Sequence, residues 1–244
     1  MKWTRVGQGP ALCWIHGLGE SSSCFHSILE HLPSFAHHLV DLPGYGRATR
    51  VATPYSLMEA ADQLADDLQE IAPCLLIGHS MGGVVGLFLA EKHPRLLRGL
   101  INVDGNISLG DCGYSGPISR QTQSEFVSRG YGELLTSLQE RGVDDLAHRG
   151  YFASMQLAQP EVVYTHSQDL VRWSAEESLA RRMAELAVPS VYIAGAPGGA
   201  AERSLELLEK AKVETRLIGP SGHWPFIDQP EQFVEQVRAW HKQL

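Results

Sequence analysis

The sequence lacks any apolar run that approaches the roughly 20 residues of a membrane-spanning helix. Its N-terminal residues include no apolar segment of the kind that signal peptides carry, so we expect a cytoplasmic protein. Positive charge is also scarce, because 20 Lys and Arg stand against 28 Asp and Glu, which gives a formal net charge of −8. This balance argues against nucleic acid or an anionic membrane surface as a partner.

Cysteine is scarce as well. The chain has only Cys13, Cys24, Cys74 and Cys112, and no two of them form a C-x-x-C pair. Cys13 and Cys74 lie in or beside apolar runs, where a reduced cysteine behaves as a small hydrophobic residue. We therefore predict neither a disulfide framework nor a metal site. A chain of 244 residues is long enough to bury a stable core without them.

Short apolar runs alternate with longer helical patterns along most of the chain. The expected strands are 11–15, 38–41, 75–78, 99–104, 190–195 and 213–218. The expected helices are 22–31, 56–71, 81–93, 201–210 and 230–241. Residues 56–59 have the Ser-x-x-Glu form of a capping box, which supports a helix start at that point. This alternation predicts an α/β protein with a parallel sheet and crossover helices.

The alternation stops between residue 105 and about residue 188. This stretch is rich in helix formers and lacks a convincing buried strand. Its aromatic residues are Phe126, Tyr131, Tyr151, Phe152, Tyr164 and Trp173. We predict an α/β core formed by residues 1–104 and 189–244, with residues 105–188 inserted as a helical cap over the sheet.

The most informative motif follows the expected strand 75–78. Residues 78–83 read Gly-His-Ser-Met-Gly-Gly and lead directly into a helical run, which is the G-x-S-x-G motif in its strand–turn–helix context. The serine of such a turn has a strained backbone, so the positions two before and two after it must lack side chains. Gly78 and Gly82 meet that demand. The motif predicts Ser80 as a catalytic nucleophile at the carboxyl edge of the sheet.

Three other motifs lie, relative to this turn, in the order and at the spacing found in a known family. Residues 16–19 read His-Gly-Leu-Gly, residues 41–47 read Asp-Leu-Pro-Gly-Tyr-Gly-Arg, and residues 222–225 read Gly-His-Trp-Pro. Together the four motifs resemble the α/β-hydrolase superfamily, particularly its compact esterase-like members with a helical cap. The resemblance implies a mostly parallel twisted sheet flanked by helices, with shortened edge strands before residue 11. We interpret residues 41–47 as structural, with charges that hold neighbouring loops.

The resemblance also implies how Ser80 is activated. A hydroxyl is too weak an acid to attack a carbonyl unaided, so an imidazole must accept its proton. Of the eleven histidines, His223 alone occupies the family's base position. The backbone N–H groups of Leu18 and Met81 occupy the positions that form the family's oxyanion hole, where donors stabilise the charge that develops during attack.

The acid of the triad departs from the family's commonest pattern. An Asp usually follows the strand equivalent to 190–195, but residues 196–201 read Ala-Pro-Gly-Gly-Ala-Ala, and the first carboxylate is Glu202. Asp104 is the best substitute, because it ends the strand that follows the nucleophile's strand and keeps the order Ser, Asp, His. Some haloalkane dehalogenases, which share this fold, look similar in that they take their acid from the end of this strand. Glu202, Asp228 and a Ser–His dyad without an acid are the alternatives.

The leading hypothesis is hydrolysis of an ester or related acyl compound through an acyl-enzyme, without a metal or organic cofactor. The expected partner is a small-molecule acyl substrate, small to medium in size and apolar, in contact with Phe152, Trp173 and Trp224. Because this fold hosts several chemistries, a cofactor-free C–C bond hydrolase, a lyase and a perhydrolase are alternatives. A ligand receptor without catalysis is a further alternative, which only the missing usual acid favours.

Overall fold

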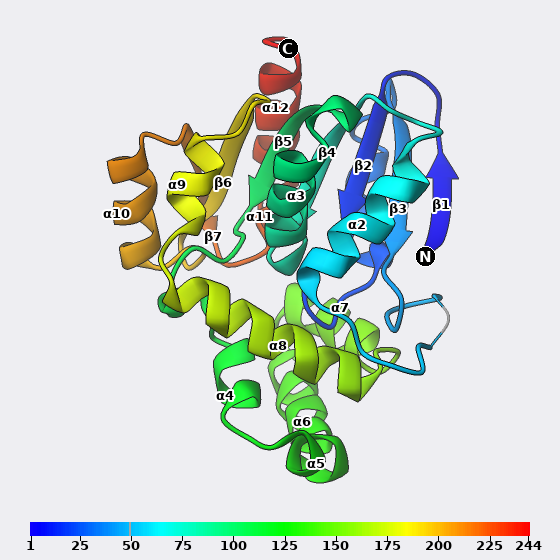
Figure 1. Cartoon of the computed structure of the whole chain (residues 1–244), viewed down its shortest axis with the longest axis vertical. Coiled ribbons are helices and arrows are strands. Elements are labelled where there is room, and N and C mark those ends of the chain that lie inside the picture. The colour runs from blue at the N-terminus through cyan, green and yellow to red at the C-terminus, as the bar shows by residue number, and fades with distance from the viewer. Residues whose placement is uncertain (49) are drawn as a thin grey trace.

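The computed structural model describes residues 1–48 and 50–244 and contains a seven-stranded sheet. Its strands are β1 (Lys2–Val6), β2 (Ala11–Ile15), β3 (Ala36–Asp41), β4 (Cys74–His79), β5 (Leu97–Val103), β6 (Ser190–Pro197) and β7 (Thr215–Ser221). The spatial order is β1-β3-β2-β4-β5-β6-β7, and Figure 1 shows the sheet twisting from β1 to β7. Only β1 pairs antiparallel, with Lys2 opposite Asp41, and the other pairs are parallel.

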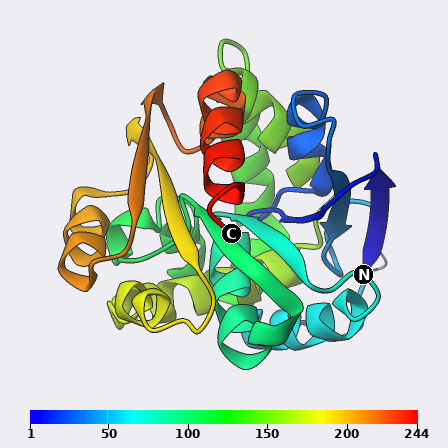
Figure 2. The same cartoon turned by 90° about the horizontal axis from the view of Figure 1, so that it is seen from above.

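Helices cover both faces of the sheet. One face carries α2 (Leu57–Leu68), α3 (Met81–Lys92), α9 (Leu179–Ala184) and α10 (Glu202–Ala211), and the other carries α1 (His26–Leu29) and α12 (Pro230–His241) (Figure 2). Short elements join them: η1 (Ser22–Phe25), η2 (Pro94–Leu96) and α11 (Pro225–Asp228). The helix predicted over 22–31 is only η1 and α1. Among the described residues no helix has the length and apolar character to span a membrane.

Local hydrogen bonds explain where some of these elements begin and how the loops are held. The predicted capping box opens α2: Ser56 Oγ accepts from the Glu59 N–H at 3.2 Å, and Glu59 Oε2 accepts from the Ser56 N–H at 2.7 Å. At the end of β3, the Asp41 carboxylate accepts from the backbone N–H groups of Ser22 at 2.6 Å and Arg47 at 3.1 Å. The residue 41–47 motif therefore holds neighbouring loops, as predicted.

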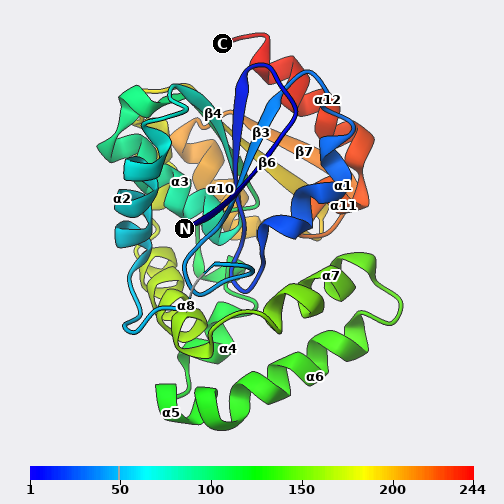
Figure 3. The ribbon, with the colours of Figure 1, turned by 90° about the vertical axis from the view of Figure 1, so that its right-hand side faces the viewer.

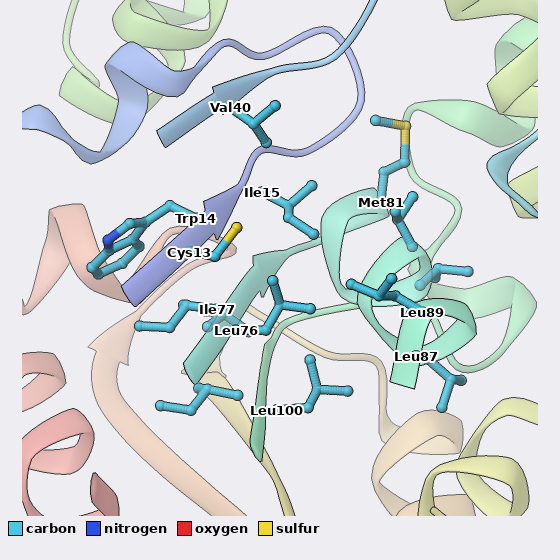
Figure 4. Packing of buried hydrophobic residues seen from close by; sticks show 14 of the residues in the cluster. Cys13, Trp14, Ile15, Val40, Leu76, Ile77, Met81, Leu87, Leu89 and Leu100 are labelled. Carbon is cyan, nitrogen blue, oxygen red and sulfur yellow. The ribbon is translucent and has the colours of Figure 1, made fainter. Parts of the chain in front are cut away.

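The core lies between the sheet and its flanking helices. Figure 4 shows strand residues such as Ile15 and Leu76 on the side of the sheet that faces Met81 and Leu89 of α3. Residues 81–90 are buried on every side of α3, because this helix lies against the sheet and is covered by its neighbours. Cys13 lies in the same cluster as a free thiol with no exposed surface, so its predicted role as a small hydrophobic residue is confirmed.

The chain between β5 and β6 forms helices and loops, and its described residues contain no strand. After η3 (Leu109–Asp111), its elements are α4 (Ser115–Ser119), α5 (Gln123–Glu125), the π-helical turn η4 (Phe126–Gly130), α6 (Tyr131–Arg141), α7 (Leu146–Met155) and α8 (Pro160–Ala175). Helices α4 to α8 stand over the carboxyl ends of the parallel strands (Figures 1 and 3). Helix α9, which the prediction placed in the insertion, lies beside the sheet in contact with α3 and α10.

Candidate active site

Ser80 occupies the sharp turn between β4 and α3, with φ 52° and ψ −119°. A residue with a side chain adopts this left-handed region only where its surroundings enforce it. A Cβ on Gly78 would lie 2.2 Å from the Gly82 carbonyl oxygen, and one on Gly82 would lie 2.3 Å from that of Ile15. The Ser80 N–H donates to the Val103 carbonyl at 2.8 Å and fixes the turn to β5. The two glycines thus allow the strained turn that the motif predicted.

The loop after β7 carries His223. Asp228 holds the start of this loop, because its Oδ2 accepts from Ser221 Oγ at 3.0 Å and from the Gly222 N–H at 2.8 Å. A Cβ on Gly195 would lie only 1.8 Å from the Gly222 carbonyl oxygen, so the loop can pass β6 only where that strand lacks a side chain. These contacts bring His223 to the carboxyl edge of the sheet.

Ser80 and His223 line one small cavity of about 30 Å³ between the sheet and the helices above it. Leu18 and Trp224 line the same cavity, so the structure brings four predicted site residues together. The polar side chains of Asn106, Asp111 and Ser115 also line it. The arrangement places a hydroxyl and an imidazole beside the same confined space.

The surroundings of His223 keep its imidazole neutral. Its ring centroid lies 4.8 Å from that of His79 and 5.2 Å from that of Trp224. Burial disfavours the imidazolium, the positive charge of His79 adds to this effect, and together they lower the His223 pKa to about 3. A neutral imidazole can accept a proton, which is the state that a general base requires.

The predicted oxyanion donors lie on either side of Ser80. Met81 is the first residue of α3, where backbone N–H groups have no partner within the helix. Leu18 lines the cavity, and its N–H donates to no described residue. A Cβ on Gly17 would lie 3.1 Å from Ser80 Cβ, so this glycine permits the close approach of the Leu18 loop. Neither N–H group has a hydrogen-bond partner among the described residues, although Met81 itself does not line the cavity.

Asp104 follows β5 directly, with a φ of 47°. Its Oδ2 accepts from the Gly195 N–H at 2.9 Å, while its Oδ1, though buried, has no partner among the described residues. Burial raises the Asp104 pKa to about 8, so the carboxyl is protonated at neutral pH. The expected hydrogen bond from His223 to Asp104 is not formed, because the carboxyl is bound to β6 and the His223 ring lies against His79 and Trp224.

The glycines after β6 leave room for the Asp104 carboxyl. A Cβ on Gly199 would lie 2.6 Å and 2.7 Å from the two carboxylate oxygens of Asp104. A Cβ on Gly198 would lie 3.2 Å from the Gly222 Cα, beside the loop that carries His223. The Asp104 carboxyl thus lies against the segment where the family usually places its acid, and a side chain at Gly198 would reach toward the base loop.

Neither alternative acid contacts the imidazole. Glu202 is exposed in the first turn of α10. Asp228 contacts the backbone and the serine of the base loop, as described above, and not the His223 ring. No described carboxylate therefore contacts the His223 ring, and of the three candidates Asp104 has a buried oxygen without a partner.

The cap contributes different aromatic residues from those predicted. Trp173 packs against Phe88 of α3, with ring centroids 5.0 Å apart, and does not line the cavity. Phe152 packs against the core and does not line the cavity either. Tyr114 and Tyr151 line it instead, and the sequence shows no signal that separates Tyr151 from its neighbour Phe152.

A buried ion pair beside Ser80 was also missed. His79 Nδ1 lies 2.8 Å from Glu20 Oε2, and both side chains are almost fully buried. Burial favours the uncharged form of each group, but their mutual attraction and hydrogen bonds outweigh it, which lowers the Glu20 pKa to about 2 and raises the His79 pKa. Glu20 directly follows the residue 16–19 motif, and no local pattern indicates its distant partner.

Comparison with known proteins agrees with this geometry. The sequence model of the alpha/beta hydrolase family matches residues 14–236, so the chain belongs to that family. Its relatives include pimeloyl-[acyl-carrier protein] methyl ester esterases from Yersinia enterocolitica and Edwardsiella ictaluri. The first is 29% identical and covers 96% of this chain and 95% of its own length. The second is 32% identical and covers 95% and 93%.

A solved structure is similar along the whole chain. The thermophilic esterase from Thermogutta terrifontis has a TM-score of 0.82 with 20% sequence identity, and the match covers 99% of this chain and 93% of the esterase. At this identity the likeness concerns the fold alone. The predicted fold is confirmed by the family match and this structure, and the predicted class, an ester hydrolase, is confirmed by the esterase relatives.

Proposed function

We propose that the chain hydrolyses its ester through a covalent acyl-enzyme on Ser80, with His223 as general base and Asp104 as the acid of the triad. The observation that carries this proposal is the strained turn that presents Ser80 to the same small cavity as the neutral His223 imidazole. Asp104 takes part when the His223 ring turns toward the unpartnered Oδ1 of Asp104.

The proposed reaction has two halves. His223 accepts the Ser80 proton as Oγ attacks the ester carbonyl, and the Leu18 and Met81 N–H groups bind the oxyanion. His223 then gives the proton to the departing alcohol, which leaves the acyl group on Ser80. In the second half, His223 activates a water that attacks the acyl-enzyme, and the proton returns to Ser80 as the acid departs.

The substrate that we propose is an acyl ester of a small alcohol. The relatives' names specify a methyl ester of an acyl chain on a carrier protein, and the confined space beside Ser80 suits a small leaving group. The test compares kcat/KM for methyl, butyl and benzyl esters of one acyl chain, with the pimeloyl-carrier-protein methyl ester as a further substrate. Folded protein that hydrolyses none of these esters would favour a receptor or one of the other chemistries.

The pH profile should show that a neutral His223 is required. Because the pKa of His223 is about 3, kcat/KM for an activated ester should still be appreciable at pH 5, where an ordinary histidine would be protonated. The limb of the profile that His223 protonation sets should appear only as the pH drops toward 3, separate from any limb that Asp104 ionisation sets near pH 8. Short assays after a pH jump measure kcat/KM before the protein unfolds. Low pH promotes unfolding because His223 binds a proton at a higher pH in the unfolded chain than in the folded one. A midpoint near 6.5 would contradict the proposed environment of His223.

We propose that the helices between β5 and β6 select the substrate, and Tyr114 is the residue placed to do so. Tyr114 lines the catalytic cavity and also a second hollow of about 340 Å³ between α4 and α6, whose walls include Ile118, Phe126 and Leu134. Its hydroxyl is bound to His148 Nε2 at 2.8 Å and accepts from Arg141 Nη1 at 3.3 Å. The Tyr114 ring thus forms a wall between the two spaces.

Replacing Tyr114 by alanine should join the two spaces. We expect kcat/KM for octanoyl and decanoyl p-nitrophenyl esters to rise relative to acetate by about tenfold, because several methylene groups gain an apolar site. Tyr114→Phe is the matched control, since it keeps the ring and removes only the two hydroxyl contacts, and it should keep the wild-type profile. An unchanged chain-length profile in folded Tyr114→Ala would exclude the ring as a wall.

A further inference from the structure

We propose that Glu20 and His79 act together as positioning residues, which hold the oxyanion loop, the nucleophile turn and the base loop in one arrangement through a buried charged pair. This inference rests on the proposed function of Ser80 and His223. It concerns two groups that the reaction itself does not use, and it assigns them an effect on the reaction rate.

The Glu20 carboxylate joins three segments that are distant in sequence. Its Oε2 accepts from the Gly17 N–H at 2.6 Å, in the loop that carries Leu18. The same oxygen accepts from His79 Nδ1 at 2.8 Å, directly before Ser80. Its Oε1 accepts from Trp224 Nε1 at 2.6 Å, directly after His223. One side chain therefore contacts the immediate neighbours of the oxyanion donor, the nucleophile and the base.

His79 closes this network from the other side. Its Nε2 donates to the His223 carbonyl oxygen at 2.8 Å. Each ring nitrogen of His79 therefore faces an acceptor, a carboxylate on one side and a carbonyl on the other. The Gly17 and Trp224 N–H groups already donate to the two Glu20 oxygens, which favours the ionised carboxylate. The hydrogen bonds and the raised pKa of His79 therefore favour an imidazolium at His79, whose two nitrogens then both donate.

The energetics favour a role beyond stability. Side-chain exposure is 1% for His79 and 3% for Glu20, so the pair has lost nearly all its hydration. Buried ion pairs rarely stabilise a fold more than apolar residues of the same volume would. Here the pair orients three loops on which the proposed chemistry depends, and misplacement of such groups by about 1 Å can lower a rate by roughly 100-fold.

The pair also bears on the protonation of the base. The charged and titratable groups that face His223 are His79 from the nucleophile turn, Glu20 from the oxyanion loop and His148 from α7. The His79 charge opposes protonation of His223, whereas the Glu20 charge favours it. Loss of the His79 charge alone should therefore raise the pH at which His223 takes up a proton.

The test uses Glu20→Gln, His79→Gln and the double variant, with Glu91→Gln as the control. Glu91 forms an ion pair with Arg182 between α3 and α9 and contacts none of the three loops. We expect kcat to fall by roughly 10- to 100-fold in each single variant with KM changed less than threefold. We expect His79→Gln to move the acidic limb up by about one pH unit or more. The double variant should lose less than the product of the single losses, and Glu91→Gln should match wild type.

Two further measurements distinguish failure of the proposed function from failure of this inference. Fluorophosphonate labelling of the wild-type chain reports on the proposed function, and its absence would overturn that function together with this inference. Wild-type labelling with unchanged kcat and pH limb in folded single variants would overturn the inference alone. If the single variants do not fold, ¹⁵N-histidine spectra of the wild-type protein decide: the inference requires both His79 ring nitrogens to carry protons at pH 7, and a neutral ring would overturn it.

Discussion

Replacing Ser80 by alanine should lower kcat for ester hydrolysis by about 10⁴-fold or more, while the fold remains intact. The change removes only a hydroxyl, because alanine keeps the Cβ that the turn already accommodates at a φ of 52°. The Ser80 N–H still donates to Val103, so the turn keeps its anchor to β5. Steady-state kinetics with p-nitrophenyl acetate and a thermal unfolding curve measure the two quantities.

Ser115→Ala is the matched control for this experiment. Ser115 lines the same cavity but lies in α4, away from the strained turn. Its loss should change kcat less than about tenfold, since no bond to the substrate forms or breaks there. If folded Ser80→Ala keeps more than about a tenth of the wild-type kcat, Ser80 is not the nucleophile.

Asp104→Asn should have the second largest effect and should change activity and stability in opposite directions. We expect kcat to fall by roughly 10³- to 10⁴-fold, because an amide cannot stabilise the imidazolium that forms on His223. If the ionised carboxylate is required, wild-type kcat/KM rises as the pH passes about 8, and Asp104→Asn removes this rise.

The stability effect follows from the raised pKa of Asp104. An unfolded Asp ionises near pH 4, whereas the folded carboxyl stays protonated up to about pH 8. The free energy of unfolding therefore falls as the pH rises between these values, because only the unfolded state gains from losing the proton. Asparagine never ionises. We therefore expect Asp104→Asn to raise Tm at pH 7 by roughly 5–10 °C, with no gain below about pH 4.

A second substitution tests whether the position of the carboxylate or merely its presence matters. Gly198→Asp in the Asp104→Asn background places a carboxylate beside the base loop, and we expect it to restore at least about tenfold in kcat. Asp at Gly113, where a Cβ would meet nothing within 4 Å, is the control and should restore nothing. Full activity in Asp104→Asn, or equal rescue from both positions, would exclude Asp104 as the acid.

The sheet could be predicted well because each inner strand is an apolar run with turn residues at its ends. Strand β2 occupies the predicted residues, and β4, β5, β6 and β7 extend or shift the predicted strands by a few residues. The resemblance implied shortened edge strands before residue 11, but the residues of β1 could not be assigned, because Lys2–Val6 is exposed along much of its length and is defined by pairing with β3. Pairing at an edge leaves little trace in the hydrophobic pattern.

The site was predictable where local backbone geometry dictates residue type. Gly78 and Gly82 are required by contacts within the turn and with the neighbouring strand, so the sequence carries their signal directly. Asp104 and Glu20 depend instead on packing between distant segments: Asp104 contacts Gly195, and Glu20 contacts Trp224, 204 residues away. Such contacts leave no local pattern, and for the same reason Phe152 and Trp173 could not be told from Tyr114 and Tyr151.

The central claim, an activated nucleophile at Ser80, is tested most directly by intact-protein mass spectrometry after reaction with a fluorophosphonate. The phosphonyl group should add once per chain, with loss of fluoride, and peptide mapping should place it on Ser80. Ser80→Ala should gain no mass, and His223→Ala should react far more slowly because its hydroxyl has no base. A stable adduct on another residue, or no adduct on folded protein that still hydrolyses esters, would contradict the account.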